Sequence, residues 1–179
     1  ELIRVFVITN TMYLLIATEN TTHFSVALGE DKIQSVKTVK RAFKHAEFLL
    51  RTIDGLIKNL KSKIKNVGTD RLSAIFVVNG PGGFSATRIG VATANAMAYA
   101  LNIPVIGVKI EEEWKGLSEK KKLERVWERA VGELKVKMEK SLNQSLRSDS
   151  GQVKVNEESF SFVTPYYNAE PHITVKKES

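Results

Sequence analysis

The sequence contains no cysteine, which excludes disulfide bonds and thiolate metal sites. It also lacks a long hydrophobic run, because the longest apolar stretches, residues 2–8 and 13–17, are far shorter than the roughly 20 residues of a membrane-spanning helix. No segment resembles a signal peptide. The three histidines are scattered, without the i, i+4 pair that suits a metal ion. We therefore expect a cytoplasmic protein with no metal site and no membrane partner.

Positive charge is concentrated in one segment. The net charge is +7, from 27 basic and 20 acidic residues. Residues 37–65 contain nine basic and two acidic side chains, so this segment carries the whole excess. A basic stripe can attract phosphates or an acidic partner. No RNA-binding motif accompanies it, however, and we interpret it as a solvated face.

The hydrophobic pattern predicts a compact series of strands and helices. Alternating or continuously apolar stretches indicate strands, and apolar residues at a period of about 3.6 indicate helices. We expect strands at residues 12–18, 23–29, 32–39, 73–78 and 103–108, and helices at 42–64 and 84–101. The expected buried face of the first helix is Ala46, Leu49, Leu50, Ile53, Leu56, Ile57, Leu60 and Ile64.

This order of elements, β-β-β-α-β-α-β, predicts an α/β fold. A three-stranded meander joined to βα units is typical of a ribonuclease H-like sheet, the half-unit of actin-like ATPases (the ASKHA fold). We expect this lobe to span residues 12–110. Residues 1–11 precede it as an extension without a separate function.

The composition changes after residue 110. A long charged helix is expected at 119–143, a polar linker at 143–158, and terminal strands at 159–175. We interpret residues 111–179 as a reduced, mainly helical second lobe.

The segment NGPGGFSATRIG, residues 79–90, contains the first candidate site. A glycine-rich turn before a helix presents N–H groups that can bind an anion. The candidate contacts for an anion or nucleotide are Gly80, Gly82, Gly83, Ser85 and Arg88. The segment is not a Walker A loop, because it lacks the terminal Gly-Lys-Ser/Thr. The glycines could equally serve a tight turn, with Ser85 as the N-cap of the helix.

The helix that follows carries a row of small residues. Ala86, Gly90, Ala94 and Ala98 recur every four residues, and such a row allows another backbone to approach closely. The alternative is tight packing on the chain's own sheet. His45 is interpreted as a partly exposed structural or interface residue, since Glu47, two positions away, points elsewhere. No residue forms a plausible nucleophile with a base.

Four segments resemble the TsaB (YeaZ) family. ENTTHFSVALGED at 19–31 is similar to the family's first hairpin, and HAEFLLRTID at 45–54 is similar to its first helix. The long segment at 79–108 resembles its glycine-rich block, and TPYYNAEPHIT at 164–174 resembles its C-terminal phrase. Residues 12–110 are covered well by this resemblance, and the C-terminal part thinly.

The resemblance implies a non-catalytic subunit in the synthesis of threonylcarbamoyladenosine in tRNA. Its partners would be a TsaD-like catalytic subunit, a TsaE-like ATPase, a second copy in isolation, and tRNA through the complex. No cofactor would be bound tightly, and ATP would bind only at the interface with a partner. The implied interface residues are His45, Glu47, Leu49, Ala86, Arg88, Gly90, Ala94 and Ala98.

Two departures from the family pattern leave alternatives open. Thr18 replaces the family's first-strand Asp, which makes nucleotide chemistry in this chain doubtful. The family's ALDARRGEVY phrase has no counterpart after residue 110. The alternatives are a self-associating module of actin-like fold without a tRNA role, and a degenerate ATPase or inactive glycoprotease homologue.

Overall fold

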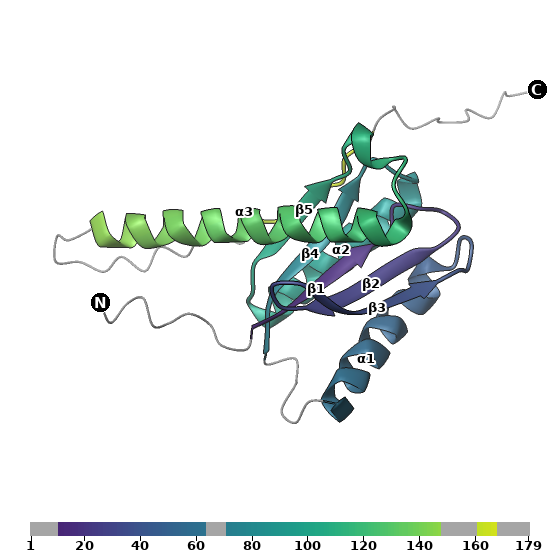
Figure 1. Ribbon diagram of the computed structural model, residues 1–179, viewed down its shortest axis with the longest axis horizontal. Helices are drawn as coiled ribbons and strands as arrows, with labels where there is room; N and C mark the ends of the chain where they lie inside the picture. Colours follow the sequence, from purple (N-terminus) through teal and green to yellow (C-terminus); the bar gives the residue numbers. More distant parts are fainter. Residues whose placement is uncertain (1–10, 64–70, 148–160, 168–179) are drawn as a thin grey trace, which may run out of the picture.

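The computed structural model of the protein describes residues 11–63, 71–147 and 161–167, and it contains a five-stranded sheet with helices on both faces (Figure 1). The strands are β1 (Met12–Ala17), β2 (Phe24–Gly29), β3 (Ile33–Val39), β4 (Leu72–Gly80) and β5 (Val105–Lys109). The helices are α1 (His45–Lys63), α2 (Phe84–Leu101) and α3 (Glu119–Arg147), with the 3-10 helix η3 (Glu112–Trp114) before α3. The predicted order of strands and helices is confirmed.

The sheet is mixed, with strand order β3-β2-β1-β4-β5. The pairs β1–β2 and β2–β3 are antiparallel, whereas β1–β4 and β4–β5 are parallel. Antiparallel neighbours need only short turns, but each parallel pair needs a crossover connection. The helices α1 and α2 are those crossovers, which places the carboxyl ends of β1, β4 and β5 at one edge of the sheet.

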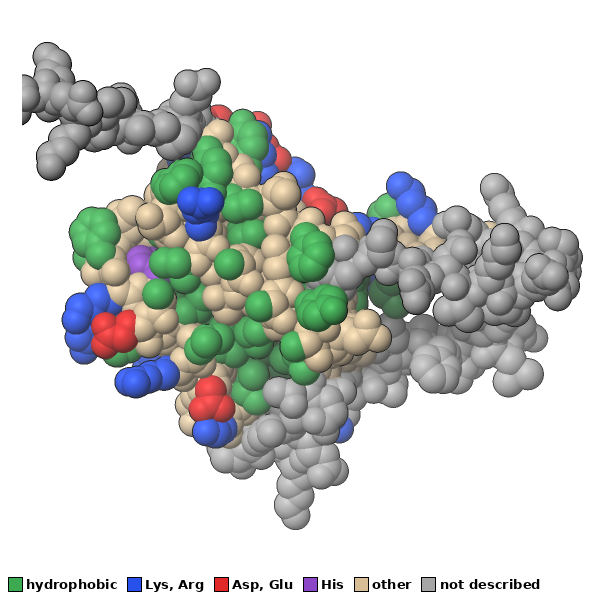
Figure 2. Space-filling model, turned by 180° about the vertical axis from the view of Figure 1, so that it is seen from behind, with side chains coloured by type: hydrophobic (Ala, Val, Ile, Leu, Met, Phe, Trp, Pro, Cys, Tyr) green, Lys and Arg blue, Asp and Glu red, His purple; other side chains and the backbone are tan. Residues whose placement is uncertain are grey.

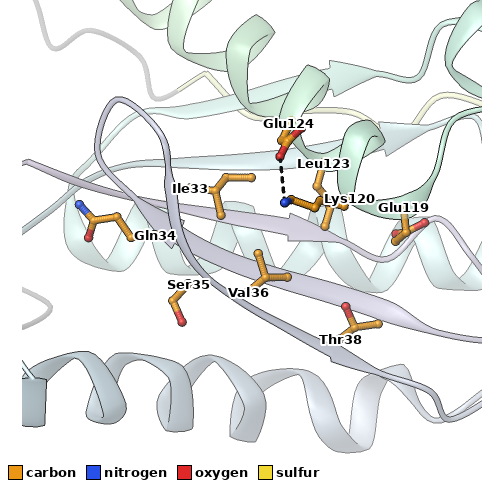
Figure 3. Close-up of a pocket in the computed structure, with 9 residues that line it drawn as sticks. All are labelled: Ile33, Gln34, Ser35, Val36, Thr38, Glu119, Lys120, Leu123 and Glu124. Carbon is orange, nitrogen blue, oxygen red and sulfur yellow. Dashed lines mark ion pairs between the residues drawn. The ribbon is translucent and has the colours of Figure 1, made fainter.

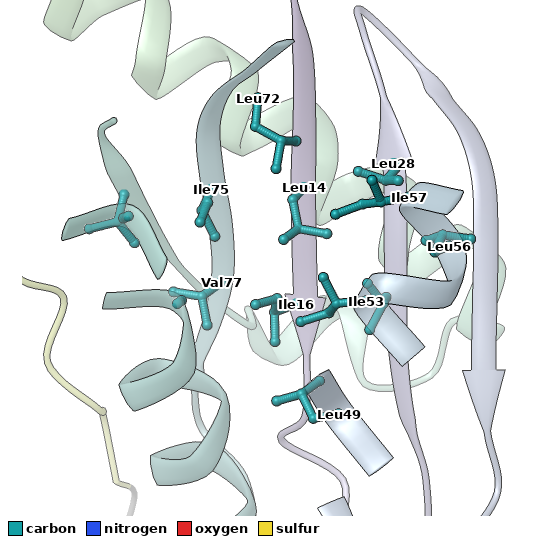
Figure 4. Close-up of a cluster of buried hydrophobic side chains, with 14 of the residues drawn as sticks. Leu14, Ile16, Leu28, Leu49, Ile53, Leu56, Ile57, Leu72, Ile75 and Val77 are labelled. Carbon is teal, nitrogen blue, oxygen red and sulfur yellow. The ribbon is translucent and has the colours of Figure 1, made fainter. Parts of the chain in front are cut away.

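The helices α1 and α2 cover one face of the sheet. Leu14 and Ile16 of β1 point into this layer, where they join a cluster with Leu49 and Ile53 of α1 (Figure 4). All six residues of β1 are buried. Because the strand is covered on both faces, its sequence is continuously apolar rather than alternating.

The first half of α3 covers the opposite face. The ring of Trp127 lies 5.4 Å from that of Phe76 and 6.3 Å from that of Tyr13. Leu123 and Leu134 are buried in the same cluster. Residues 119–134 therefore pack directly on the sheet, on the face opposite α1 and α2, and the predicted division into two lobes stays a prediction.

The C-terminal boundaries also differ from those predicted. The helix α3 continues to Arg147, so the predicted linker at 143–158 begins too early. Residues 161–167 contain no strand, although terminal strands were predicted at 159–175. The rest of that range, and residues 1–10 of the predicted extension, lie outside the described residues.

The helix α1 begins three residues later than predicted, at His45. Phe43 has a φ of 58°, a left-handed conformation that cannot continue a helix, and its side chain is 85% exposed. Ala46 and Leu50, predicted on the buried face of α1, are also exposed. Within the described ranges, no helix is both long and apolar enough to cross a membrane.

Candidate functional site

The glycine-rich loop between β4 and α2 packs tightly on the loop that follows β1. The N–H of Gly83 donates a hydrogen bond to the carbonyl oxygen of Glu19 over 2.7 Å. A Cβ atom at Gly82 would overlap the backbone of Glu19. Gly80 has a φ of 123°, which L side chains rarely adopt. Gly82 and Gly83 therefore allow the two loops to approach closely at the carboxyl edge of the sheet, whereas Gly80 lies against the backbone of Tyr166.

The N-terminus of α2 starts at this loop. Gly83 is the N-cap residue, and no side chain makes a capping hydrogen bond there. The prediction of Ser85 as N-cap is therefore wrong, because Ser85 lies in the first turn and is exposed. The first turn contains no acidic residue to offset the positive end of the helix dipole. Anion contact through Gly80, Gly82, Gly83, Ser85 and Arg88 stays a prediction.

Thr18 lies where the resemblance places an aspartate. It is completely buried, and its Oγ1 donates a hydrogen bond of 2.8 Å to the carbonyl oxygen of Ala86. The hydroxyl therefore ties β1 to the first turn of α2. The described residues contain no group of three His, Asp or Glu side chains that could hold a metal ion.

Glu19 is the one described carboxyl group with a clearly shifted pKa. The residue is partly exposed, but its Oε2 is inaccessible and has no hydrogen-bond partner among the described residues. Burial raises the pKa of this carboxyl above its ordinary value of 4.5, and Glu119 adds to the rise. A hydrogen bond from its own backbone opposes the rise, as do Lys122 and His23. The charge of Glu19 is thus poorly accommodated in the folded state.

Replacing Glu19 by Gln is expected to stabilise the fold at neutral pH. Because the pKa of Glu19 is raised in the folded state, the folded chain binds a proton at this carboxyl more tightly than the unfolded chain does. The contribution of Glu19 to stability is fully present below pH 4.5 and is lost as pH rises through the folded-state pKa. Urea unfolding should therefore show a more stable Glu19→Gln variant at pH 8, with the difference shrinking at pH 4. Glu47→Gln, at an exposed carboxylate, serves as control, and a pH-independent difference for Glu19→Gln would contradict this assignment.

The small-residue row of α2 faces the chain's own sheet. Ala86, Gly90, Ala94 and Ala98 are all buried. A Cβ atom at Gly90 would overlap Oγ1 of Thr18, the residue that follows β1. The close backbone approach that these small residues allow is therefore made within the chain. This packing is the alternative that the sequence left open for the row.

Two predicted interface residues of α1 are also interior. His45 and Leu49 are only 2% and 1% exposed. The Nε2 atom of His45 lies 2.7 Å from the carbonyl oxygen of Asn20 and 3.1 Å from that of His23. Since both neighbours are acceptors, Nε2 carries the proton and anchors the β1–β2 loop to α1. His45 and Leu49 are structural, and the prediction of a partly exposed His45 is wrong.

Glu47 and Arg88 are the predicted interface residues that remain at the surface. The carboxylate of Glu47 lies 3.8 Å from the amine of Lys44, the residue before α1, in an exposed ion pair. The guanidinium of Arg88 lies over the ring of Phe84, 4.7 Å from its centroid. Arg88 is the only charged residue in α2.

The outward side of α2 is almost without charge. Its exposed residues, called here the α2 outer face, are Phe84, Ser85, Arg88, Ala92, Ala96, Tyr99 and Ala100. Figure 2 views this side of the molecule, where hydrophobic side chains are spread over the centre and most charged ones lie toward the rim. A solvated helix face is normally polar or charged. The α2 outer face is thus poor in charge for an exposed helix surface.

The segment 161–167, called here the C-terminal strap, lies beside this face. Asn95 of α2 donates from Nδ2 to the carbonyl oxygen of Val163 (2.8 Å) and accepts from the Val163 N–H (3.0 Å). Asn79 of β4 donates to the carbonyl oxygen of Thr164 (3.2 Å), and its own carbonyl accepts the N–H of Tyr166 (2.6 Å). The strap is therefore held mainly by asparagine side chains, with one backbone hydrogen bond to β4.

Asn79, Asn95 and the residues of the strap are not among the site residues predicted from the sequence. The phrase at 164–174 marks the segment, but nothing in the sequence pairs Val163 with Asn95, 68 positions away. An asparagine among small residues at mid-helix is the one local signal, because Asn has a low helix propensity.

A groove of about 420 Å³ lies on the other side of the sheet, between β3 and α3 (Figure 3). Its floor includes Ile33, Val36 and Leu123. At its rim, Lys120 and Glu124 form an ion pair of 4.0 Å. No residue of the glycine-rich loop lines the groove, and the charges of Lys120 and Glu124 at its rim are paired with each other.

The fold defines the broad class of the protein. A three-stranded antiparallel meander, followed by two strands parallel to β1 and helices on both faces, is the ribonuclease H-like arrangement that actin-like ATPases share. The predicted fold class is confirmed.

Part of the chain is similar in sequence to known proteins. Residues 38–112 match the family model described as TsaD, tRNA N6-adenosine threonylcarbamoyltransferase. A protein of that name from Geotalea daltonii is 41% identical over 59 residues, which are 33% of this chain and 17% of that protein. Part of this chain is therefore similar to TsaD, and the alignment spans less than a fifth of this curated relative's length.

Solved structures with similar folds include YeaZ from Pseudomonas aeruginosa, with 26% identity, a TM-score of 0.49, and coverage of 55% of this chain and 44% of that one. RuvC from Thermus thermophilus, in complex with a Holliday junction substrate, has 12% identity and a TM-score of 0.39, covering 68% of this chain and 79% of that one.

Proposed function

We propose that this chain is a non-catalytic subunit in the synthesis of threonylcarbamoyladenosine in tRNA, and that its α2 outer face docks a TsaD-like catalytic subunit. The relation to TsaD and YeaZ supports the pathway. The matched residues 38–112 include α1, β4, α2 and β5, which build this side of the molecule. We assign no catalytic residue to the chain, since a buried threonine, Thr18, holds the position of the expected carboxylate.

The observation that carries this proposal is the composition of α2. The helix has 18 residues, and Arg88 is its only charge, although a whole side of it is exposed. Ala92 and Ala96 lie in the middle of that side, where short side chains allow another helix to pack closely. Exposed apolar surface of this kind is typical of protein interfaces. Arg88, at the edge of the alanines, would meet a carboxylate of the partner.

Docking would act by selecting one arrangement of the catalytic subunit. A partner that binds the active arrangement more tightly than the inactive one raises its population by that difference in affinity. ATP would bind at the interface or in the catalytic subunit, and tRNA and a TsaE-like ATPase would join through the complex. The chain itself would supply the docking surface.

The test is co-elution with the TsaD-like protein of the same organism, with and without ATP. A complex is expected for the unmodified chain. No complex under either condition, together with unchanged tRNA modification, would exclude this function. A chain that elutes alone as a dimer through the same face, and never with the catalytic subunit, would instead favour a self-associating module. Tight magnesium-dependent binding of ATP by the chain alone would favour a degenerate ATPase.

Arg88→Ala is expected to weaken the complex about tenfold, the usual size for loss of an interface arginine. The side chain is exposed and touches only the Phe84 ring among the contacts described, so the fold should be unaffected. Titration calorimetry of the two subunits measures the affinity. Arg125→Ala, at an exposed arginine of α3 on the opposite side of the sheet, is the matched control. Equal affinities for both variants would remove Arg88 from the interface.

A further inference from the structure

We infer that the C-terminal strap forms one border of the docking surface, and that Asn95 is the positioning residue that holds it there. This inference rests on the proposed function and names a second element of the same surface. Its contribution would be to extend the α2 outer face with aromatic side chains from a distant part of the chain.

The geometry of α2 places the strap next to the docking residues. At about 100° per residue, Phe84, Asn95, Arg88 and Tyr99 fall within roughly 60° of one another around the helix, and Ala92 follows about 20° further. The strap, held by Asn95, therefore runs along the edge of the α2 outer face. A partner helix that covers Arg88 and Ala92 would also contact the strap.

Aromatic contacts join the strap to this face at two points. The ring of Tyr167 lies 4.8 Å from that of Phe84, and the ring of Phe162 is stacked on Tyr99 at 6.4 Å. Phe162 nevertheless remains 58% exposed and Tyr99 67% exposed. These pairs form a surface made half by α2 and half by the strap. Tyrosine and phenylalanine are enriched at the centres of protein interfaces.

The strap shares the uncharged character of α2. Its sequence, SFVTPYY, contains no ionisable acid or base apart from the two tyrosines. The amine of Lys109 lies 3.7 Å from the centroid of the Tyr166 ring. Among the residues that the structure describes, the strap and the α2 outer face themselves carry one cation, Arg88, with Lys109 against the strap. This is the composition expected of a surface that another protein covers.

The position of the strap depends on Asn95 in particular. A neighbouring strand would satisfy both the N–H and the carbonyl of Val163, and here one amide side chain makes both bonds. Val163 also packs at the margin of the core, against Gly107. Without Asn95, the strap loses the bidentate contact at Val163 that aligns the neighbouring Phe162 with Tyr99 of α2, whereas Asn79 still holds Thr164 and Tyr166.

Asn95→Ala in the full chain separates this role from a merely structural one. Chymotrypsin cleavage at the aromatic residues of the strap should become about tenfold faster, because the open state is more populated. Affinity for the catalytic subunit should fall about tenfold in parallel. Asn95→Asp keeps the acceptor for the Val163 N–H but cannot donate to its carbonyl, so both readouts should be intermediate. Arg88→Ala, by contrast, should lower affinity without changing the cleavage rate.

Different results overturn the inference and the proposed function separately. If Asn95→Ala releases the strap while affinity stays unchanged, the strap is only structural and the docking proposal stands. If cleavage does not accelerate, Asn95 does not position the strap. If the unmodified chain forms no complex with the catalytic subunit, the proposed function is overturned, and the inference that rests on it is overturned with it. Should Asn95→Ala fail to fold, Phe162→Ala keeps the asparagine contacts, and unchanged affinity in that variant would equally overturn the inference.

Discussion

Gly90→Leu is expected to abolish the folded structure of this chain. A Cβ atom at Gly90 already overlaps Oγ1 of Thr18, and the Cβ of Thr18 is only 3.1 Å away. Thr18 cannot yield, because it follows the central strand β1 and its hydroxyl bonds to Ala86. Overpacking a core costs about 1–3 kcal/mol when the surroundings can adjust, and more here. Since typical domains are stable by only about 5–15 kcal/mol, urea unfolding followed by far-UV circular dichroism should show a greatly reduced or absent transition.

Gly132→Leu is the matched control for this prediction. Gly132 lies within α3, and a Cβ atom there would meet nothing within 4 Å. Leu is a better helix former than Gly by roughly 1 kcal/mol, so this variant should be as stable as the parent or more so. A stable, well-folded Gly90→Leu chain would show that α2 can move away from β1, and the internal packing described for the small-residue row would be incorrect.

Ala92→Arg is expected to abolish docking of the catalytic subunit while leaving the fold intact. Ala92 lies two positions from Gly90 on the helix, so it points away from the sheet and is exposed. An arginine there would place a long charged side chain in the middle of the alanine surface and hold the partner helix away. Burying an unpaired charge is among the costliest changes at an interface, and we expect affinity to fall at least about 100-fold.

The control for this variant is Val136→Arg. Val136 is 49% exposed on α3, on the other side of the sheet, so it adds the same side chain to a helix away from the docking surface. Both variants should unfold at the same urea concentration as the parent, and only Ala92→Arg should fail to co-elute with the catalytic subunit. Retention of full affinity by Ala92→Arg would place the interface elsewhere on the molecule.

The sequence predicts the fold well, because its strands and helices differ clearly in pattern. The β1 and β4 stretches are continuously apolar, as strands covered on both faces must be. The first helix shows the helical period, with Ile53, Leu56 and Ile57 buried as expected. The short connections then leave few possible topologies.

The exposed surface of α2 is less predictable, because small side chains occur on nearly every side of this helix. Ala86, Ala94 and Ala98 are buried, whereas Ala92 and Ala96 are exposed, although all five are the same residue. Helical periodicity identifies rows of small residues but gives no contrast that tells the sheet-facing row from the outward one. Only the tertiary contact between Gly90 and Thr18 decides it.

The contacts of the strap and of α3 are not predictable from the sequence for a different reason. The bonds between Asn95 and Val163 join residues far apart in the chain, which no local pattern reveals. Similarly, the apolar seam of α3 through Trp127 looks the same whether it packs on this sheet or within a second lobe. Its partners, Tyr13 and Phe76, come from two separate strands.

The position of α3 in the chain has a consequence for synthesis on the ribosome. Within the described ranges, the sheet face formed by Tyr13, Leu15 and Phe76 is covered mainly by α3, a helix that is made after the five strands. While the chain emerges, α1 and α2 can close one side of the sheet, but the other side stays bare until residues 119–134 have left the exit tunnel. A nascent chain of this kind exposes apolar strand surface late in translation, the state in which chaperones bind and aggregation begins.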